Sequence, residues 1–322
     1  MKLYKLKFKS SIHLGERENF LETTEIIAHS DTLFSTFCNA YLLLYGKDKL
    51  EILLKRFIDQ NPPFLISSAF PWWNGNFYFP IPLNQMPKEK KLKDIRFIEK
   101  DGFEKLLWGE KIEKLVKNGF KTIPELDAEK EENKKPYRII NTPRVSLNRL
   151  TNHPGEEFFH FGEVFYKDNS GLFFLVDFKD KEIEKEFNAT LRIMADEGLG
   201  GDRTVGKGFF EIKEIKDINF NFPSEHNGFL TLSLYSPKED EIRDIRNGYY
   251  EIIERKGYIS SPYGKNLRRK SIRVFKEGSV FPHLIKIGRL VDVTPEVFTE
   301  HKIYRYGLAF LLPCKLEVKD EN

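Results

Sequence analysis

The most informative stretch of this sequence is Gly198-Leu-Gly-Gly-Asp-Arg-Thr-Val-Gly-Lys-Gly208. Five of its eleven residues are glycine, which permits positive φ angles and close approach to a ligand backbone. Free amides in such a loop can line an anion site, and Arg203 and Lys207 add two cations. The stretch nearly matches a nucleotide P-loop, but Gly208 stands where that motif needs Ser or Thr. We therefore interpret residues 198–208, the glycine loop, as a site for a phosphate backbone.

The segments around the glycine loop predict a mixed α+β fold. A helix over residues 181–195 precedes the loop, and a strand over 209–215 follows it. Residues 2–14 alternate apolar side chains with Lys and predict a first strand. We also expect helices over 33–45 and 48–59, with Ser30 or Asp31 as N-cap of the first and Gly46 as its terminator. Strands are expected over 64–68, 76–82, 158–166 and 171–178, and the last two of these should form a hairpin. Elements mixed in this way favour a ferredoxin-like sandwich.

The organisation of the chain predicts two domains. Residues 1–218 hold the elements described above, and residues 219–322 are mostly strands, over 229–235, 248–258, 271–277, 286–293 and 303–318. Residues 86–135 contain 14 Lys/Arg and 12 Asp/Glu with scattered apolar residues. We interpret them as an inserted, solvent-exposed segment of short helices, most polar near 125–135.

The distribution of charge is more informative than its total. The net charge is only +3, from 52 Lys and Arg against 49 Asp and Glu. Two basic stretches nevertheless lack any carboxylate: residues 134–149 and residues 265–273 each hold five cations. Each alone is typical of a solvated edge. Together with the glycine loop they favour a nucleic-acid groove, beside which Tyr137, Tyr258 and Tyr263 could stack bases.

Several classes of protein are disfavoured. The two cysteines, Cys38 and Cys314, lie in apolar runs and are expected to be reduced core thiols of a cytoplasmic protein. No zinc-ligand spacing, no run of 18 apolar residues and no signal peptide is found, so we expect no metal, no cofactor and no membrane. No nucleophile motif is present, and Asp31 lacks the partners that a metal site for RNA cleavage needs.

A set of motifs in this order resembles one known family. The motifs are His29-Ser-Asp-Thr-Leu33, Ser67-Ser-Ala-Phe-Pro71 leading to Phe77-Tyr-Phe-Pro80, Thr142-Pro-Arg-Val-Ser-Leu-Asn-Arg149, the glycine loop, and Tyr304-Arg-Tyr-Gly-Leu-Ala-Phe310. Together they resemble the RAMP-superfamily subunit of the type III-A CRISPR effector, the Csm complex, that holds the 5′ end of the guide RNA. The resemblance spans nearly the whole chain, except that residues 86–135 carry no matching motif.

The resemblance implies two ferredoxin-like (RRM-like) RAMP domains and binding of the repeat-derived 5′ handle of the CRISPR RNA. It implies contact with the large polymerase-domain subunit and with the repeated backbone subunit, which cuts the target RNA. It implies that this subunit itself is non-catalytic. The RNA-binding residues that it implies are His29, Ser30 and Asp31 at the helix start, Arg144 and Arg149 in the strand motif, and Gly198, Gly200, Gly201, Arg203, Gly206, Lys207 and Gly208 in the glycine loop. We add Lys265, Arg268 and Arg269 on their charge alone.

Two other functions stay open at this point. The first is a RAMP endoribonuclease that processes the precursor CRISPR RNA, for which His29 is the only candidate general base near the groove. The second is a protein scaffold whose basic stretches meet acidic partner surfaces. Such a scaffold should bind guide RNA no better than random RNA.

Overall fold

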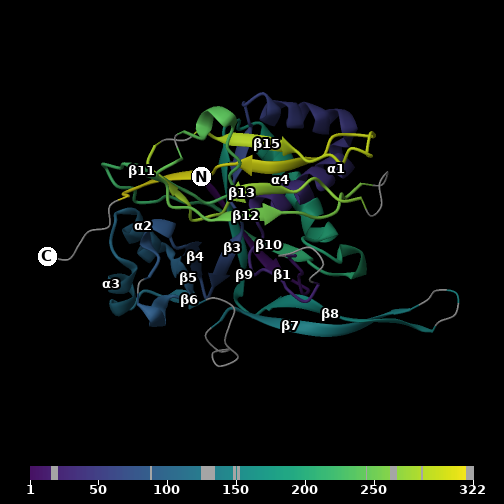
Figure 1. Ribbon diagram of the computed structural model, residues 1–322, viewed down its shortest axis with the longest axis horizontal. Helices are drawn as coiled ribbons and strands as arrows, with labels where there is room; N and C mark the ends of the chain where they lie inside the picture. Colours follow the sequence, from purple (N-terminus) through teal and green to yellow (C-terminus); the bar gives the residue numbers. More distant parts are fainter. Residues whose placement is uncertain are drawn as a thin grey trace.

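The computed structural model describes residues 1–15, 21–87, 89–124, 135–147, 150, 153–243, 245–261, 267–283 and 286–316, with the backbone alone at residues 124, 146 and 154–157. Its framework is an eight-stranded antiparallel sheet in the order β10-β1-β9-β3-β4-β5-β6, with β2 also paired to β9. The strands are β1 (Lys2–Phe8), β2 (Phe64–Ile66), β3 (Phe70–Trp73), β4 (Asn76–Pro80), β5 (Ile95–Glu99), β6 (Thr122–Pro124), β9 (Ser170–Phe178) and β10 (Phe210–Asp217). The large sheet lies at the centre of the molecule (Figure 1).

Two helices cover one face of the large sheet. They are α1 (Ser30–Ile58) and α4 (Ile183–Glu197), and the ring of Phe187 in α4 packs on Phe37 of α1 and Tyr4 of β1 at centroid distances of 4.9 and 5.4 Å. Within α1, the backbone angles of Gly46, φ 82° and ψ 175°, lie outside the helical region and interrupt the helix. The predicted end of one helix and start of another at Gly46 are thus confirmed. The predicted capping by Ser30 or Asp31 is wrong, because His29 is the N-cap residue and makes no side-chain cap.

The inserted segment differs from its prediction. It does contain two short helices, α2 (Lys100–Leu107) and α3 (Ile112–Lys117). However, β5 and β6 extend the large sheet, and Phe103, Leu106 and Leu115 are fully buried against it. The expectation of an entirely solvent-exposed helical insertion was wrong, because widely spaced apolar residues gather on one side of short elements. Residues 125–134, its most polar part, lie outside the described residues.

Two long strands form an arm that extends from the body. They are β7 (Tyr137–Leu147) and β8 (Pro154–Tyr166), which pair antiparallel with each other and form a separate two-stranded sheet. The arm projects beneath the large sheet in Figure 1. The predicted hairpin between 158–166 and 171–178 was wrong, since β8 pairs with β7 whereas β9 pairs with β1, β2 and β3. The turn between them connects two different sheets.

The C-terminal half is built of short strands in three small sheets. The sheets are β14-β11-β17, β12-β13 and β15-β16, formed by β11 (Gly228–Thr231), β12 (Ile252–Arg255), β13 (Ile272–Phe275), β14 (Val280–Phe281), β15 (Gly288–Asp292), β16 (Tyr304–Leu308) and β17 (Leu311–Cys314). Its core is continuous with that of the large sheet, since Leu230, Tyr306 and Leu312 belong to the same buried cluster as Leu3 and Phe34. The predicted α+β class is confirmed, while the division at residue 218 stays a prediction.

Candidate functional site

The glycine loop connects α4 to β10 and folds back on itself. The amide of Leu199 donates to Gly208 O, that of Gly208 to Ser11 O, and that of Gly201 to His13 O, at 2.8–2.9 Å. At Gly208, φ is +75° and a Cβ would lie 2.0 Å from the carbonyl oxygen of Leu199. These three amides are therefore used within the protein and are not the free amides that the sequence analysis expected. Gly198, Gly200 and Gly201 also pack against the chain itself.

The tip of the glycine loop has a different character. Residues Arg203–Val205 form a short 3-10 turn, with Thr204 and Val205 exposed and Arg203 half-buried. At Gly206 a Cβ would meet nothing within 4 Å, so this side of the loop is open. The Arg203 guanidinium has no ion pair within the described part of the chain. The tip thus presents a cation that is free to meet an external anion.

Lys207, by contrast, is held inside the protein. Its Nζ lies 2.6 Å from Glu163 Oε1 and donates to Ser11 Oγ at 2.9 Å. Glu163 also accepts hydrogen bonds from the hydroxyls of Ser11 and Thr142, each at 2.7 Å. Burial raises the pKa of Glu163, but the hydrogen bonds from Lys207, Ser11 and Thr142 outweigh it and lower the pKa to about 2. Lys207 therefore fastens the glycine loop to the arm.

Arg144 makes a second connection between the arm and the glycine loop. Its guanidinium pairs with the carboxylate of Asp202 and lies 4.0 Å from the centre of the Phe161 ring. The Arg144 side chain keeps 29% of its surface exposed, so one side of it still faces solvent. Two residues predicted separately, Arg144 of the strand motif and Arg203 of the glycine loop, thus lie near one another, because Asp202 precedes Arg203. Arg149 and Lys265 lie outside the described residues.

His13 is a residue at the glycine loop that the sequence reasoning missed. Its ring lies 4.3 Å from Phe161 and its Nδ1–H donates to Gly162 O at 2.8 Å. Because a carbonyl oxygen only accepts, the proton of the neutral ring is on Nδ1 and Nε2 carries the lone pair. The sequence offers no signal for this residue, since the residues that contact it are more than 140 positions away.

The predicted helix-start residues lie inside the molecule, not on its surface. His29, Ser30 and Asp31 are 2%, 0% and 2% exposed. Nδ1 of His29 lies 2.8 Å from Glu277 Oε1, and Nε2 lies 2.6 Å from Glu25 Oε2. Burial lowers the pKa of His29, but these two carboxylates outweigh it and raise the pKa to about 10. His29 is therefore protonated at neutral pH.

Asp31 joins the first helix to the C-terminal half. Arg255 donates to both of its carboxylate oxygens at 3.0 Å, and Arg305 donates to one of them. Burial opposes ionisation of Asp31, yet the two guanidinium groups hold its pKa well below its usual range. We call this buried cluster the seam network; its members are Glu25, His29, Asp31, Ser68, Arg255, Glu277 and Arg305. None of its three C-terminal members, Arg255, Glu277 and Arg305, was identified as a site residue from the sequence.

The two remaining predicted cations lie beside the seam network. Arg269 donates to Ser35 Oγ of α1 at 3.4 Å, and burial together with the positive Arg305 lowers its pKa to about 10. Arg268 is exposed and its guanidinium lies 5.7 Å from the ring centre of Tyr258. Arg269 thus lies against α1 and Arg268 on Tyr258, whereas Arg144, Arg203 and Lys207 lie at the glycine loop. The structure therefore places the predicted cations in two regions.

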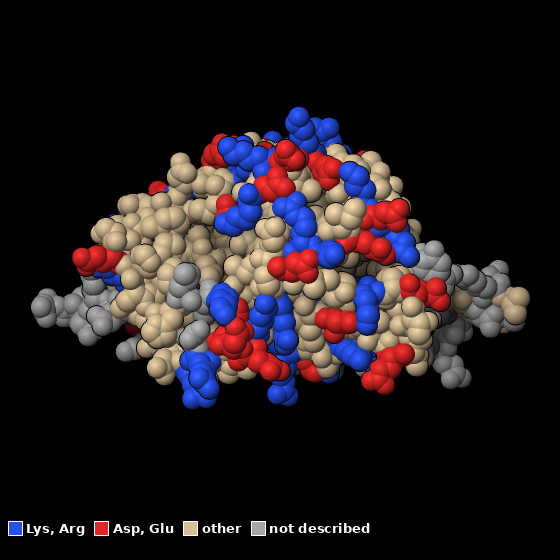
Figure 2. Space-filling model, turned by 90° about the horizontal axis from the view of Figure 1, so that it is seen from above, with Lys and Arg blue, Asp and Glu red and all other residues tan. Residues whose placement is uncertain are grey.

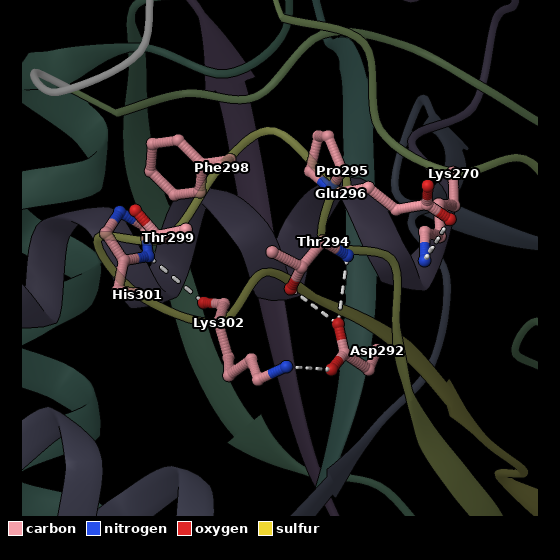
Figure 3. Close-up of a pocket in the computed structure, with 9 residues that line it drawn as sticks. All are labelled: Lys270, Asp292, Thr294, Pro295, Glu296, Phe298, Thr299, His301 and Lys302. Atoms are coloured by element: carbon pink, nitrogen blue, oxygen red, sulfur yellow. Dashed lines mark hydrogen bonds and ion pairs between the residues drawn. The ribbon is translucent and has the colours of Figure 1, made fainter.

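A further hollow of about 550 Å³ lies in the C-terminal half (Figure 3). Its charged side chains pair with one another: Lys302 Nζ lies 3.0 Å from Asp292, and Lys270 Nζ lies 3.6 Å from Glu296. Asp292 also accepts from the amide of Thr294 at 2.9 Å. Since these groups satisfy each other, the hollow shows no preference for a charged ligand.

The charge over the upper face of the molecule is mixed. Figure 2 shows Lys and Arg side chains interleaved with Asp and Glu there, with no broad patch of one sign. Among the described residues no group of three or more His, Cys, Asp or Glu could hold a metal ion. Within the same residues no helix is long and apolar enough to cross a membrane. The cationic features are therefore local, and the glycine loop is the most complete of them.

Comparison with known proteins gives consistent matches along the chain. A family model described as the RAMP superfamily matches residues 5–211, and one described as the CRISPR Csm4 C-terminal domain matches residues 224–314. A Csm4 protein of Methanocaldococcus jannaschii is 28% identical over 97% of each chain. A Csm4 protein of Thermococcus onnurineus is 26% identical over 90% of this chain and 92% of the relative.

Solved structures show the same similarity. A chain of the Csm3–Csm4 subcomplex of a type III-A CRISPR-Cas interference complex matches with a TM-score of 0.67 at 26% identity, covering 97% of this chain and 99% of that chain. A chain of a Csm1–Csm4 cassette in complex with cA4 matches with a TM-score of 0.61 at 20% identity, covering 99% of both, and shows similarity of fold. The ferredoxin-like RAMP fold predicted from the sequence is confirmed by these matches.

Proposed function

Because this chain belongs to the RAMP superfamily and to its Csm4 family, we propose that it grips the repeat-derived 5′ handle of the CRISPR RNA in a type III-A effector complex. The observation that carries this proposal is the tip of the glycine loop. There Arg203 has no ion pair in the described chain, and Gly206 leaves the adjacent side open. An unpaired cation beside open backbone suits a phosphate of single-stranded RNA.

Arg144 completes this grip from the arm. Its exposed side lies next to the glycine loop, since Asp202 of the loop holds its guanidinium. A phosphate that approaches Arg203 would compete with Asp202 for Arg144 and gain a second cation. Arg268 on Tyr258 supplies a cation and an aromatic face for a different part of the RNA. For His29, Ser30 and Asp31 we propose a positioning role, because their burial keeps them from direct contact.

We assign the interaction partners by analogy with the relatives. Solved structures describe Csm3–Csm4 and Csm1–Csm4 assemblies. We propose that this chain likewise links the large polymerase-domain subunit to the backbone RAMP subunit, in the cytoplasm. The exposed apolar side chains of α1, among them Leu43 and Ile52 at 66% and 64%, are consistent with a subunit that covers part of its surface on assembly.

We propose that the subunit is non-catalytic. The general base of the endoribonuclease alternative would be His29, which is buried, contacts two carboxylates and has a pKa raised to about 10. A protonated imidazole cannot accept the proton of a ribose hydroxyl. His13 is the histidine beside the glycine loop, so labelled repeat RNA should be incubated with wild type and with His13→Ala. We expect intact RNA in both; cleavage lost in His13→Ala would establish the nuclease instead.

The experiment that tests the proposed function is a gentle pull-down of the tagged protein from its native host, followed by sequencing of the bound RNA. We expect RNAs that share one repeat-derived 5′ end, together with the large and backbone subunits. Mixed cellular RNA at the level of an untagged control would contradict handle binding. Partner subunits without RNA would favour the scaffold alternative.

A further inference from the structure

The open face of the large sheet carries lysines that the proposed grip does not use. Along β1, Tyr4 points towards α4, where its ring meets Phe187. Because side chains alternate along a strand, Lys5 and Lys7 point to the opposite face. In the neighbouring edge strand, Glu214 and Glu211 lie opposite these two lysines. The alternation of Lys with apolar residues in the sequence thus produces a row of cations on one face.

These lysines border a hollow of about 820 Å³. It is lined by Lys5, Lys7, Trp72, Asn74, Gly75, Asn169, Lys213 and Glu214. Three of these lining residues are cations and one is a carboxylate, so the lining carries a net positive charge. This differs from the hollow of Figure 3, whose charges pair with one another.

Lys213 donates to Glu211 at 3.0 Å, whereas the other two cations of this hollow, Lys5 and Lys7, are only weakly paired within the protein. Lys5 Nζ lies 4.0 Å from the ring centre of Trp72, and it has no ion pair in the described chain. Lys7 Nζ is 3.9 Å from Asp168, a fully exposed carboxylate whose attraction is largely screened by water. The contact with Trp72 positions the Lys5 ammonium group while leaving its charge available.

The row of lysines leads directly to the glycine loop. The amide of Lys9 donates to Phe209 O at 2.8 Å, immediately after the loop. Exposed Glu211 has its pKa lowered by a hydrogen bond from Lys213 and by the charges of Lys9 and Lys7, so these cations lie near one another. An extended polymer that contacts the loop could therefore continue along β1.

We propose that this open face, the lysine platform, binds a stretch of single-stranded RNA next to the stretch held by the glycine loop. The platform is defined by Lys5, Lys7, Lys213, Trp72, Asn74 and Asn169. The inference rests on the proposed function, because it assigns a second surface for the same RNA. Lysines two residues apart on a strand repeat at about 6.6 Å, which suits a chain with regularly spaced phosphates. The asparagine amides can meet base edges, which an acidic peptide does not offer.

The test compares two triple variants of the full-length protein in its reconstituted complex. The platform variant is Lys5→Gln/Lys7→Gln/Lys213→Gln, and the control variant is Lys90→Gln/Lys91→Gln/Lys93→Gln, which removes the same charge from exposed positions between β4 and β5. Affinity for repeat-derived RNA and for random RNA of equal length is measured at several salt concentrations. Thermal unfolding confirms that each variant folds.

We expect the platform variant to bind repeat-derived RNA roughly tenfold or more weakly, with the salt slope reduced by about 2, since each single-strand phosphate contact contributes about 0.7. The control variant should behave as wild type. If the platform variant binds repeat-derived RNA with the same affinity and salt slope as wild type, the inference is overturned and the proposed function is unaffected. If wild type binds repeat-derived and random RNA with equal affinity, and the platform variant binds both more weakly, the lysine platform is supported and recognition of the handle is contradicted.

Two further outcomes are also informative. Loss of a partner subunit from the platform variant, with RNA affinity unchanged, would assign the surface to an acidic protein and overturn the inference. No RNA binding by the wild-type complex would overturn both proposals. As a direct readout, ultraviolet crosslinking of bound RNA should modify the peptide that contains the exposed residues Asn74 and Gly75 in wild type and spare it in the platform variant.

Discussion

Two cations of the glycine loop, only four residues apart, have opposite environments. Lys207 pairs with the buried carboxylate of Glu163, whereas Arg203 stands on the tip without an ion pair in the described chain. A bound phosphate would therefore gain a new charge contact at Arg203 and would have to break an existing one at Lys207. At the scale of single residues, this difference separates a binding contact from a structural one.

Arg203→Ala should weaken binding of repeat-derived RNA by a few-fold to tenfold and reduce the salt slope by about 0.7, because one phosphate contact is removed. Fluorescence anisotropy at several salt concentrations measures both quantities. Arg192→Ala, at an exposed position on α4, is the matched control and should leave them unchanged. Equal affinity and slope in Arg203→Ala and wild type would remove Arg203 from the site.

His29 makes the stability of the protein depend on pH. Its pKa is raised to about 10 from 6.5 by Glu25 and Glu277. A raised pKa gives stabilisation that is complete below about pH 6.5 and is lost as pH rises towards 10. We expect the melting temperature of wild type to fall more than that of His29→Gln between pH 6.5 and 10, as measured by calorimetry. Parallel curves would show that His29 does not carry this dependence.

At the scale of elements, the glycine loop and the arm behave as one connected unit. Lys207 and Arg144 join them through Glu163 and Asp202. The glycines let the loop close on its own backbone, which brings the loop against the side of the arm. The loop is therefore a folded element with one open side.

Gly208→Ala and Gly206→Ala should separate these two roles. Both positions have positive φ, which costs any side chain about 1–2 kcal/mol. Only at Gly208 would the new Cβ also collide with the backbone, so Gly208→Ala should destabilise the protein by clearly more than Gly206→Ala. Urea unfolding gives the two free energies. Equal losses at the two positions would contradict the close packing of Gly208.

At the scale of the whole molecule, the seam network connects the first helix to the C-terminal half. Asp31 binds Arg255 and Arg305, and His29 binds Glu277. The buried apolar cluster also runs across this boundary. We infer that the two halves form one unit, so that the glycine loop and the Arg268 region keep a fixed separation.

Asp31→Asn should destabilise the protein by about 3–5 kcal/mol, because it leaves two buried guanidinium groups without their carboxylate. Denaturant unfolding measures this loss. Asp180→Asn, which breaks a partly exposed pair with Arg56, is the control and should cost clearly less. A loss at Asp31 no larger than that at Asp180 would contradict the seam network.

Local patterns in the sequence were sufficient to predict several elements of the fold and the family. Alternation predicted β1, Gly46 predicted the break in α1, and the ordered motifs indicated the RAMP family. These features depend on residues within a few positions of one another, so that backbone preferences and short-range spacing are sufficient. The glycine loop was recognised for the same reason.

Only the tertiary structure showed which charges are free. Asp31 and Arg305 are separated by 274 positions, and Ser11 and Lys207 by 196, so no local pattern reveals that they meet. The prediction of strand pairing failed for the same reason. Strands β8 and β9 are consecutive in the chain, but they belong to different sheets. Charge pairing and strand pairing depend on distance in space, which the order of residues does not specify. The sequence therefore identified the family and its cations, and the fold separated the buried, paired cations from the exposed ones.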